Sequence, residues 1–189
     1  TKGPVISVAY APDQLCGDEN VTGYNQVRTA TVTVIESNVN PADLEFTYFS
    51  ATDVTGDALK DEERLKEEMT KALKEADWKA DNGTYTAKNV LVFDTDANYD
   101  FSLKCTDLAG NSGSYEENEP FIIDQTAPAD LKIVYETNPI DTILEILSFG
   151  FYNPSVTVTL SASDDISGIA YFSWTYEQED GTSTTVNVD

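Results

Sequence analysis

The chain has 189 residues, with 11 basic and 34 acidic side chains, a formal net charge of −23 and no histidine. The lack of histidine excludes Ser-His-Asp and Cys-His hydrolysis and the usual His-ligated zinc sites. The shortage of cations argues against nucleic acid as a ligand. Hydrophobic residues make up 40% of the chain, which is enough for a packed core. No apolar run reaches the roughly 18 residues of a membrane span.

An internal repeat divides the chain into two parts. The matching blocks are Thr1–Tyr10 with Thr126–Tyr135, Tyr24-Asn25 with Tyr152-Asn153, and Thr29–Val34 with Thr157–Ala162. Positions 1 and 126 differ by 125, and positions 29 and 157 differ by 128, so the intervening loop is three residues longer in the second copy. A tandem domain is the favoured interpretation, and chance similarity between β-rich segments is the alternative. We expect domains at residues 1–125 and 126–189.

Alternation of apolar and polar residues predicts strands throughout the first domain. They span Val5–Tyr10, Thr29–Ile35, Leu44–Ser50, Thr84–Phe93 and Phe101–Asp107, with a short last strand at Phe121–Ile123. Within Phe101–Asp107, Phe101, Leu103 and Cys105 share one face, and the other face is polar. One buried and one wet face is typical of antiparallel sheets in a β-sandwich. The triplet Asp81-Asn82-Gly83 predicts a tight hairpin turn.

One segment of the first domain predicts a helix instead of a strand. In Asp57–Asp77, apolar residues including Leu65, Met69 and Leu73 recur at helical spacing, and Asp57 is a suitable N-cap. We interpret it as an inserted surface helix that packs by its narrow apolar stripe on the edge of the sandwich. The alternative is a helix that docks a partner.

The second domain is predicted to be incomplete. Strands are expected at Leu131–Tyr135, Val156–Ala162 and Ile169–Tyr176, with a hairpin at Asp180-Gly181. Measured against the first domain, these supply only its N-terminal half, which leaves unpaired edges and an uncovered apolar face. We expect a fragment: either the natural protein continues, or other strands complete the domain. The absence of an apolar leader at the start of the chain fits a cytosolic protein or a fragment.

The end of the first domain resembles a bacterial immunoglobulin-like repeat. The resemblance rests on Tyr99–Asn111 (YDFSLKCTDLAGN), followed by Phe121–Pro128 (FIIDQTAP), which are similar to the last strand, the loop and the link of such repeats. In addition, Tyr24-Asn25 is similar to the start of the second strand of these repeats, and Asp165–Ile169 resembles a turn of related ones. The resemblance covers both domains except the helical segment at 57–77.

This resemblance implies an all-β fold of tandem immunoglobulin-like β-sandwiches in a secreted or cell-wall-attached bacterial protein. Such repeats act as stalks or adhesive segments and carry no enzyme activity. The chain departs from antibody domains, which join two strands by a disulfide. Here Val32 and Val34 stand on the second strand, where antibody domains have a cysteine, so that disulfide is not expected.

Cys16 and Cys105 are the two cysteines of the chain. Cys16 lies in the loop before the second predicted strand, and Cys105 lies on the inward face of the fifth. A disulfide between them would suit an exported protein; the alternative is a buried thiol at Cys105 and an exposed one at Cys16. Neither cysteine is expected to act as a nucleophile, because no histidine or cationic cluster is available to lower the pKa of its thiol.

Asp107, Asn111 and Asp124 are the candidate metal ligands, since they lie in the loop after the fifth strand and at the link between domains. Their oxygen atoms suit calcium, and an ion shared between tandem modules would stiffen the link. The alternative is ordinary turn chemistry, in which Asp and Asn accept bonds from nearby backbone N–H groups and Gly110 adopts positive φ. No other cofactor is predicted.

The predicted function is that of a non-catalytic module, a structural spacer or adhesive stalk of an extracellular bacterial protein. Its expected partners are neighbouring immunoglobulin-like repeats of the same polypeptide. One alternative is a repeat that binds a glycan or a host surface protein. Another is an accessory domain of a large secreted glycoside hydrolase. Residues 1–126 carry 24 acids and 10 bases, and residues 127–189 carry 10 acids and 1 base, so the acidity is spread along both domains.

Overall fold

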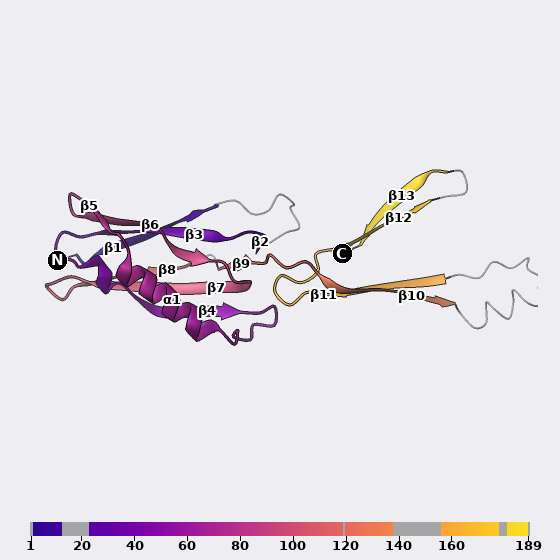
Figure 1. Cartoon of the computed structure of the whole chain (residues 1–189), viewed down its shortest axis with the longest axis horizontal. Helices are drawn as coiled ribbons and strands as arrows, with labels where there is room; N and C mark the ends of the chain where they lie inside the picture. Colours follow the sequence, from indigo (N-terminus) through magenta and orange to yellow (C-terminus); the bar gives the residue numbers. More distant parts are fainter. Residues whose placement is uncertain (1, 13–22, 119, 138–155, 178–180, 189) are drawn as a thin grey trace, which may run out of the picture. The chain divides into compact units, whose positions relative to one another are not determined.

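The computed structural model describes residues 2–12, 23–118, 120–137, 156–177 and 181–188 (Figure 1). The fold is mostly β-sheet. The chain divides into two compact units, the first formed by Thr1–Thr126 with Asp165–Ser167 and the second by Ala127–Asp164 with Gly168–Asp189.

The first unit contains two sheets (Figure 1). One has the order β1-β3-β6-β5, with β1 at Val5–Ala11, β3 at Arg28–Ile35, β6 at Thr84–Phe93 and β5 at Lys79–Asp81. The other has the order β2-β9-β7-β4, with β2 at Gly23–Tyr24, β9 at Phe121–Ile123, β7 at Ala97–Thr106 and β4 at Glu45–Thr52; β8 at Ser112–Glu116 also pairs with β7. All pairs are antiparallel except β2 with β9. The strands predicted from alternation are therefore present, with shifted ends in all but β6 and β9.

The two sheets share one hydrophobic core, to which each contributes alternate residues of its strands. Phe101 and Leu103 are fully buried and Cys105 is 1% exposed, as the alternation predicts. From the other sheet, Val32 and Phe93 are fully buried. Ring contacts join the sheets: the centroids of Phe93 and Tyr99 lie 5.0 Å apart in an edge-to-face arrangement.

The predicted helix is present but shorter than expected. It is α1, Glu62–Glu75, and it begins after Asp61. Asp57 is not the N-cap: its backbone N–H donates to Oδ1 of Asp53 at 3.0 Å, because Asp53 organises a tight loop before the helix. A single antiparallel bridge between Thr52 and Ala58 closes the same loop.

Helix α1 lies against β4 and β6, one strand from each sheet, and covers the core between them (Figure 1). Its buried side chains are Leu65, Met69 and Leu73, which belong to the predicted apolar stripe. The stripe is therefore used by the protein's own core. Arg64, on the exposed side, pairs with Asp61 and Glu68 at 3.0 and 2.9 Å.

The predicted hairpin turn joins β5 to β6. Asn82 and Gly83 have φ of 45° and 76°, the positive values that a two-residue hairpin turn requires. Gly113 of β8 has no room for a side chain, because a Cβ there would lie 1.6 Å from the carbonyl oxygen of Pro4. The segment before β1 therefore crosses β8 at backbone contact.

Among its described residues, the second unit contains two separate two-stranded ribbons. β10 (Ala129–Thr137) pairs with β11 (Val156–Ser163), and β12 (Phe172–Glu177) pairs with β13 (Ser183–Val188). The predicted strands and the hairpin near Gly181 are thus present, and Gly181 has φ of 80°. Asp180 lies outside the described residues.

The ribbon β10–β11 repeats the register of β1–β3. Val8 lies opposite Val32 in the first unit, and Ile133 lies opposite Leu160 in the second. These positions differ by 125 and 128 residues, the offsets of the two sequence blocks. The aligned blocks therefore pair in the same way in both units.

Candidate functional site

The chain enters and leaves the first unit at opposite ends. Val5 lies opposite Ile35, which lies opposite Thr84, so the start of β1 and the start of β6 are at one end. The last residues, up to Thr126, bind Asp96, which follows the far end of β6. A ten-residue strand spans about 33 Å, so entry and exit are separated by roughly that distance.

The exit segment is held by the turn between β6 and β7. The backbone N–H of Gln125 donates to Oδ1 of Asp96 at 2.9 Å, and the hydroxyl of Thr126 donates to Oδ2. The side-chain amide of Gln125 donates to the backbone oxygen of Asp94 at 3.0 Å. The chain therefore stays attached to the first unit for three residues beyond β9.

The loop after β7 is closed by its own polar groups. Oδ1 of Asp107 accepts the backbone N–H groups of Ala109 and Asn111 at 2.9 and 2.8 Å, and Oδ2 accepts the side-chain amide of Asn111 at 2.9 Å. The hydrogen bond from the Asn111 side chain is the largest of the effects that lower the pKa of the Asp107 carboxyl below its usual value. Gly110 has φ of 85°. This is the turn chemistry that was the alternative to calcium.

The three candidate metal ligands do not meet in the structure. Asp107 and Asn111 follow the end of β7, whereas Asp124 follows Ile123, which lies opposite Ala97 at the start of β7. The length of β7, about 33 Å, separates them. Oδ1 of Asp124 accepts the backbone N–H of Thr126 at 3.0 Å. Within the described residues, no three Asp, Glu or Cys side chains are placed to hold a metal ion.

Cys105 lies on β7 in the core, and burial raises the pKa of its thiol. Cys16 lies outside the described residues, so the predicted disulfide stays a prediction. A raised thiol pKa lowers the thiolate fraction and therefore the reactivity of Cys105.

Arg28 forms a buried cationic site that the sequence analysis missed. It is 7% exposed, and its Cζ lies 4.0, 4.2 and 4.4 Å from the ring centroids of Tyr10, Tyr24 and Phe121. Its Nε donates to the backbone oxygen of Pro12 at 3.1 Å. Cation–π contact explains how a charge is accommodated among rings. The sequence contained an indication of this site, because Arg28 lies at an even position of the strand, like the inward-facing Ala30, Val32 and Val34.

Two tyrosines beside this site donate to one carboxylate. The hydroxyl of Tyr115 donates to Oε2 of Glu117 at 2.9 Å, and the hydroxyl of Tyr10 donates to the same oxygen. Burial raises the pKa of Tyr115 to about 12 and also raises the pKa of Tyr10. Both groups therefore remain neutral donors at neutral pH, and they connect β1 to the end of β8.

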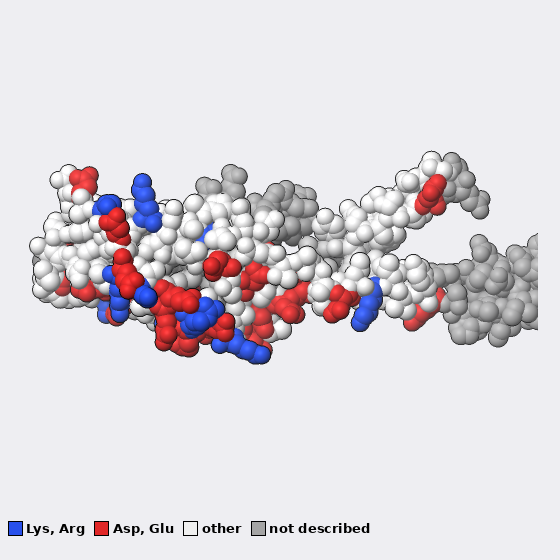
Figure 2. All heavy atoms as spheres, in the orientation of Figure 1, with Lys and Arg blue, Asp and Glu red and all other residues white. Residues whose placement is uncertain are grey.

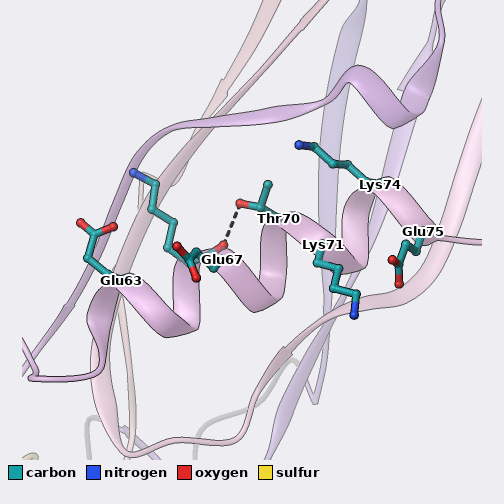
Figure 3. A pocket seen from close by; sticks show the side chains of 7 residues that line it. Glu63, Glu67, Thr70, Lys71, Lys74 and Glu75 are labelled. Atoms are coloured by element: carbon teal, nitrogen blue, oxygen red, sulfur yellow. Dashed lines mark hydrogen bonds between the residues drawn. The ribbon is translucent and has the colours of Figure 1, made fainter.

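The exposed side of α1 carries a hollow of about 360 Å³ (Figure 3). It is lined by Glu63, Lys66, Glu67, Thr70, Lys71, Lys74 and Glu75. Three acids and three bases balance, and both signs lie side by side over α1 in Figure 2. The Thr70 hydroxyl donates to the Lys66 backbone oxygen at 2.7 Å. A surface of mixed charge is typical of a solvated helix face.

The second unit contains an apolar groove of about 400 Å³ between its ribbons. It is lined by Ile133, Tyr135, Val158, Leu160, Trp174, Thr175 and Tyr176. Val158 is 51% exposed and Tyr135 69% exposed, which is unusual for large apolar side chains on paired strands. Among the described residues of the second unit, this groove gathers exposed apolar side chains from both ribbons.

Comparison of the chain with protein-family models, with curated proteins and with solved structures gave no match. Among the residues described, no helix has the length and apolar character needed to cross a membrane.

Proposed function

We propose that the chain is a non-catalytic segment of tandem immunoglobulin-like β-sandwiches from a bacterial extracellular protein, and that it acts as a structural spacer or adhesive stalk. Two packed sheets with one core in the first unit support the sandwich assignment. The shared register of β1–β3 and β10–β11 supports the tandem arrangement, since independent strand pairs have no reason to match in offset.

The observation that carries the stalk role is the position of the two chain ends of the first unit. Modules that are entered at one end and left at the other extend when joined in series, whereas modules with adjacent ends fold back. The bonds from Asp96 to Gln125 and Thr126 transmit tension to the turn between β6 and β7. The distributed negative charge adds solubility and disfavours collapse of one module on another.

Force measurement on the full chain tests this role. With handles at the N-terminus and at residue 127, a load-bearing first unit should unfold in one cooperative step. The step should release about 400 Å of contour length, because some 120 residues extend by about 3.5 Å each. Gradual extension without such a step would contradict the stalk proposal.

A binding role would give a different result. A passive spacer should retain neither glycans nor host surface proteins when the full chain is screened against arrays of both. Trp174 and Tyr176, exposed by 38 and 48%, are among the exposed aromatic side chains that can stack on a sugar ring. Retention of a glycan that is lost in Trp174→Ala would favour the carbohydrate-binding repeat instead.

A further inference from the structure

One outer face of the first unit carries no acidic side chain on its three long strands. These strands are β1, β3 and β6, which lie side by side in the sheet β1-β3-β6-β5 (Figure 1). None of their residues is acidic, although 34 of the 189 residues of the chain are. Their two cationic residues are Arg28, which is buried, and Lys88. The first unit therefore presents a nearly uncharged surface within a chain of net charge −23.

The register arranges the outward side chains of this face in four rows across the three strands. Outward positions alternate with the buried Ile6, Val32 and Ala87. The two end rows are mostly apolar, and the two middle rows are small or polar and uncharged. We call these side chains the neutral face; in order, its rows are Val5, Ile35 and Thr84; Ser7, Thr33 and Thr86; Ala9, Thr31 and Asn89; and Ala11, Thr29 and Val92.

The apolar side chains at both ends of the neutral face are exposed to solvent. Val5 is 56%, Ile35 51% and Val92 43% exposed. Exposed apolar side chains that gather in one patch with a polar surround mark an interaction surface. The middle rows are ordered by their own contacts, since the hydroxyls of Thr33 and Thr86 share a hydrogen bond at 3.4 Å. The neutral face therefore has the character of an interface and not of a solvated acidic surface.

We propose that the neutral face pairs with the neutral face of a second copy of this chain. Sheets pack face to face about 10 Å apart. A two-fold axis that runs across the strands places the row that begins with Val5 against the row that ends in Val92, so apolar rows meet. The two middle rows also meet each other, and their hydroxyls suit this contact because each can donate and accept. The neutral face is therefore self-complementary.

Charge selects a second copy as the occupant and the neutral face as the place of contact. All 24 acids of residues 1–126 lie outside β1, β3 and β6, so other pairs of faces would bring carboxylates together. A partner recognised by its charge would find no matching charges on this face. Lys79 and Asp81 of β5 border the face, as charged residues border the core of an interface. This site does not depend on the stalk role.

The size of the neutral face predicts a weak association. Rows about 6.7 Å apart and strands about 4.8 Å apart give a surface of roughly 25 by 15 Å. Two such faces bury roughly 750 Å² in total, which is below the 1,000 Å² or so of a stable interface. We expect a dissociation constant of about 0.1–1 mM, in the range of weak and transient contacts.

Sedimentation equilibrium of the full chain, at concentrations up to about 1 mM, measures this association. The chain should form dimers in 1 M NaCl, where the Debye length is about 3 Å. In 0.1 M NaCl, where it is about 10 Å, the dimer should be at least about threefold weaker, because the carboxylates outside the interface repel each other. A dimer held by opposite charges would instead weaken as salt is added.

Matched variants test the location. Thr31→Asp places a carboxylate in a middle row, where the two copies bring their charges together, and should weaken the dimer at least about tenfold. Ser7→Asp, at an exposed position of β1, should act in the same way and guards against misfolding of the first variant. Thr47→Asp adds the same charge at an exposed position of β4, in the other sheet, and should change the dissociation constant by no more than about twofold.

A chain that stays monomeric in both salt concentrations would overturn the proposal, and so would equal weakening by Thr31→Asp and Thr47→Asp. A dimer that persists in Thr31→Asp and is lost in Val158→Asp would overturn it in favour of contact through the second unit. A monomeric chain that binds a glycan array, and loses this binding in Thr31→Asp alone, would overturn it in favour of a glycan as occupant.

Discussion

The attachment of the exit segment to Asp96 can be tested by removing its carboxylate. Asp96→Ala deletes the acceptors of the Gln125 backbone N–H and the Thr126 hydroxyl. Hydrogen bonds to charged groups contribute about 1.5–3 kcal/mol. Both bonds are exposed, so we take about 0.5–1 kcal/mol for each. The segment should lose about 1–2 kcal/mol, which is roughly a 5–30-fold increase in its open population.

Amide hydrogen exchange at Gln125 and Thr126, followed by NMR on the full chain, measures that population. Asp96→Ala should accelerate exchange at these two residues by the same roughly 5–30-fold. Exchange of the core amides of β7 should not increase by more than this factor. Asp94→Ala is the matched control, because it removes an equal charge from the same turn but keeps the backbone oxygen that accepts from Gln125. Equal acceleration in both variants would refute the tether and indicate a general charge effect.

Further outcomes follow from the buried sites. Arg28→Lys keeps the charge but loses the planar stacking and the bond to Pro12, so the free energy of unfolding in urea should fall by about 2 kcal/mol; an unchanged value would contradict the cation–π assignment. The pKa of Tyr115 is raised from 10.0 to about 12, so its contribution to stability is full below pH 10 and is lost as pH rises through about 12. Tyr115→Phe should therefore flatten the fall of unfolding free energy over this pH range, and an unchanged slope would count against the assignment. Addition of calcium or of a chelator should leave the thermal midpoint unchanged, because the Asp107 carboxylate already accepts hydrogen bonds from the backbone and side chain of Asn111. A higher midpoint in calcium would show a calcium site there. Ala30→Asp should unfold the first unit in thermal scans, at a cost of about 4 kcal/mol or more, whereas Val158→Asp at the repeat-equivalent position should cost less than about 0.5 kcal/mol; similar midpoints would contradict the difference in burial.

Local pattern was sufficient for most strands of the first unit. The strand Thr84–Phe93 was predicted with its observed bounds, and Asn82-Gly83 defined the turn before it. Three short strands were not predicted: Gly23–Tyr24, Lys79–Asp81 and Ser112–Glu116. They are short and lack apolar alternation, so their strand structure comes from pairing with β6, β7 and β9 and not from their own sequence.

The limits of the site prediction have the same cause. The turn chemistry of Asp107 and Asn111 is local, and its pattern was recognised. Asp124 was grouped with them because it lies at the predicted link between domains, but β9 runs antiparallel to β7 and carries Asp124 to the other end. Asp57 was a suitable helix cap by residue type, yet Asp53 binds its backbone N–H in a competing turn. The position of Asp124 cannot be deduced without knowing which strands pair, whereas the turn of Asp53 is a local alternative to the helix cap.

The two units show that pairing and burial have separate origins. The same alternation forms the same ribbon twice, because the register of paired strands is set by which residues of the two strands face the core. Burial depends on strands far along the chain, which is why Ala30 is fully buried and Val158 is 51% exposed. Fully burying one such side chain contributes about 1.5–3 kcal/mol. An isolated two-stranded ribbon is marginal in water. Burial of the exposed apolar side chains of β10–β11 would therefore contribute several kcal/mol.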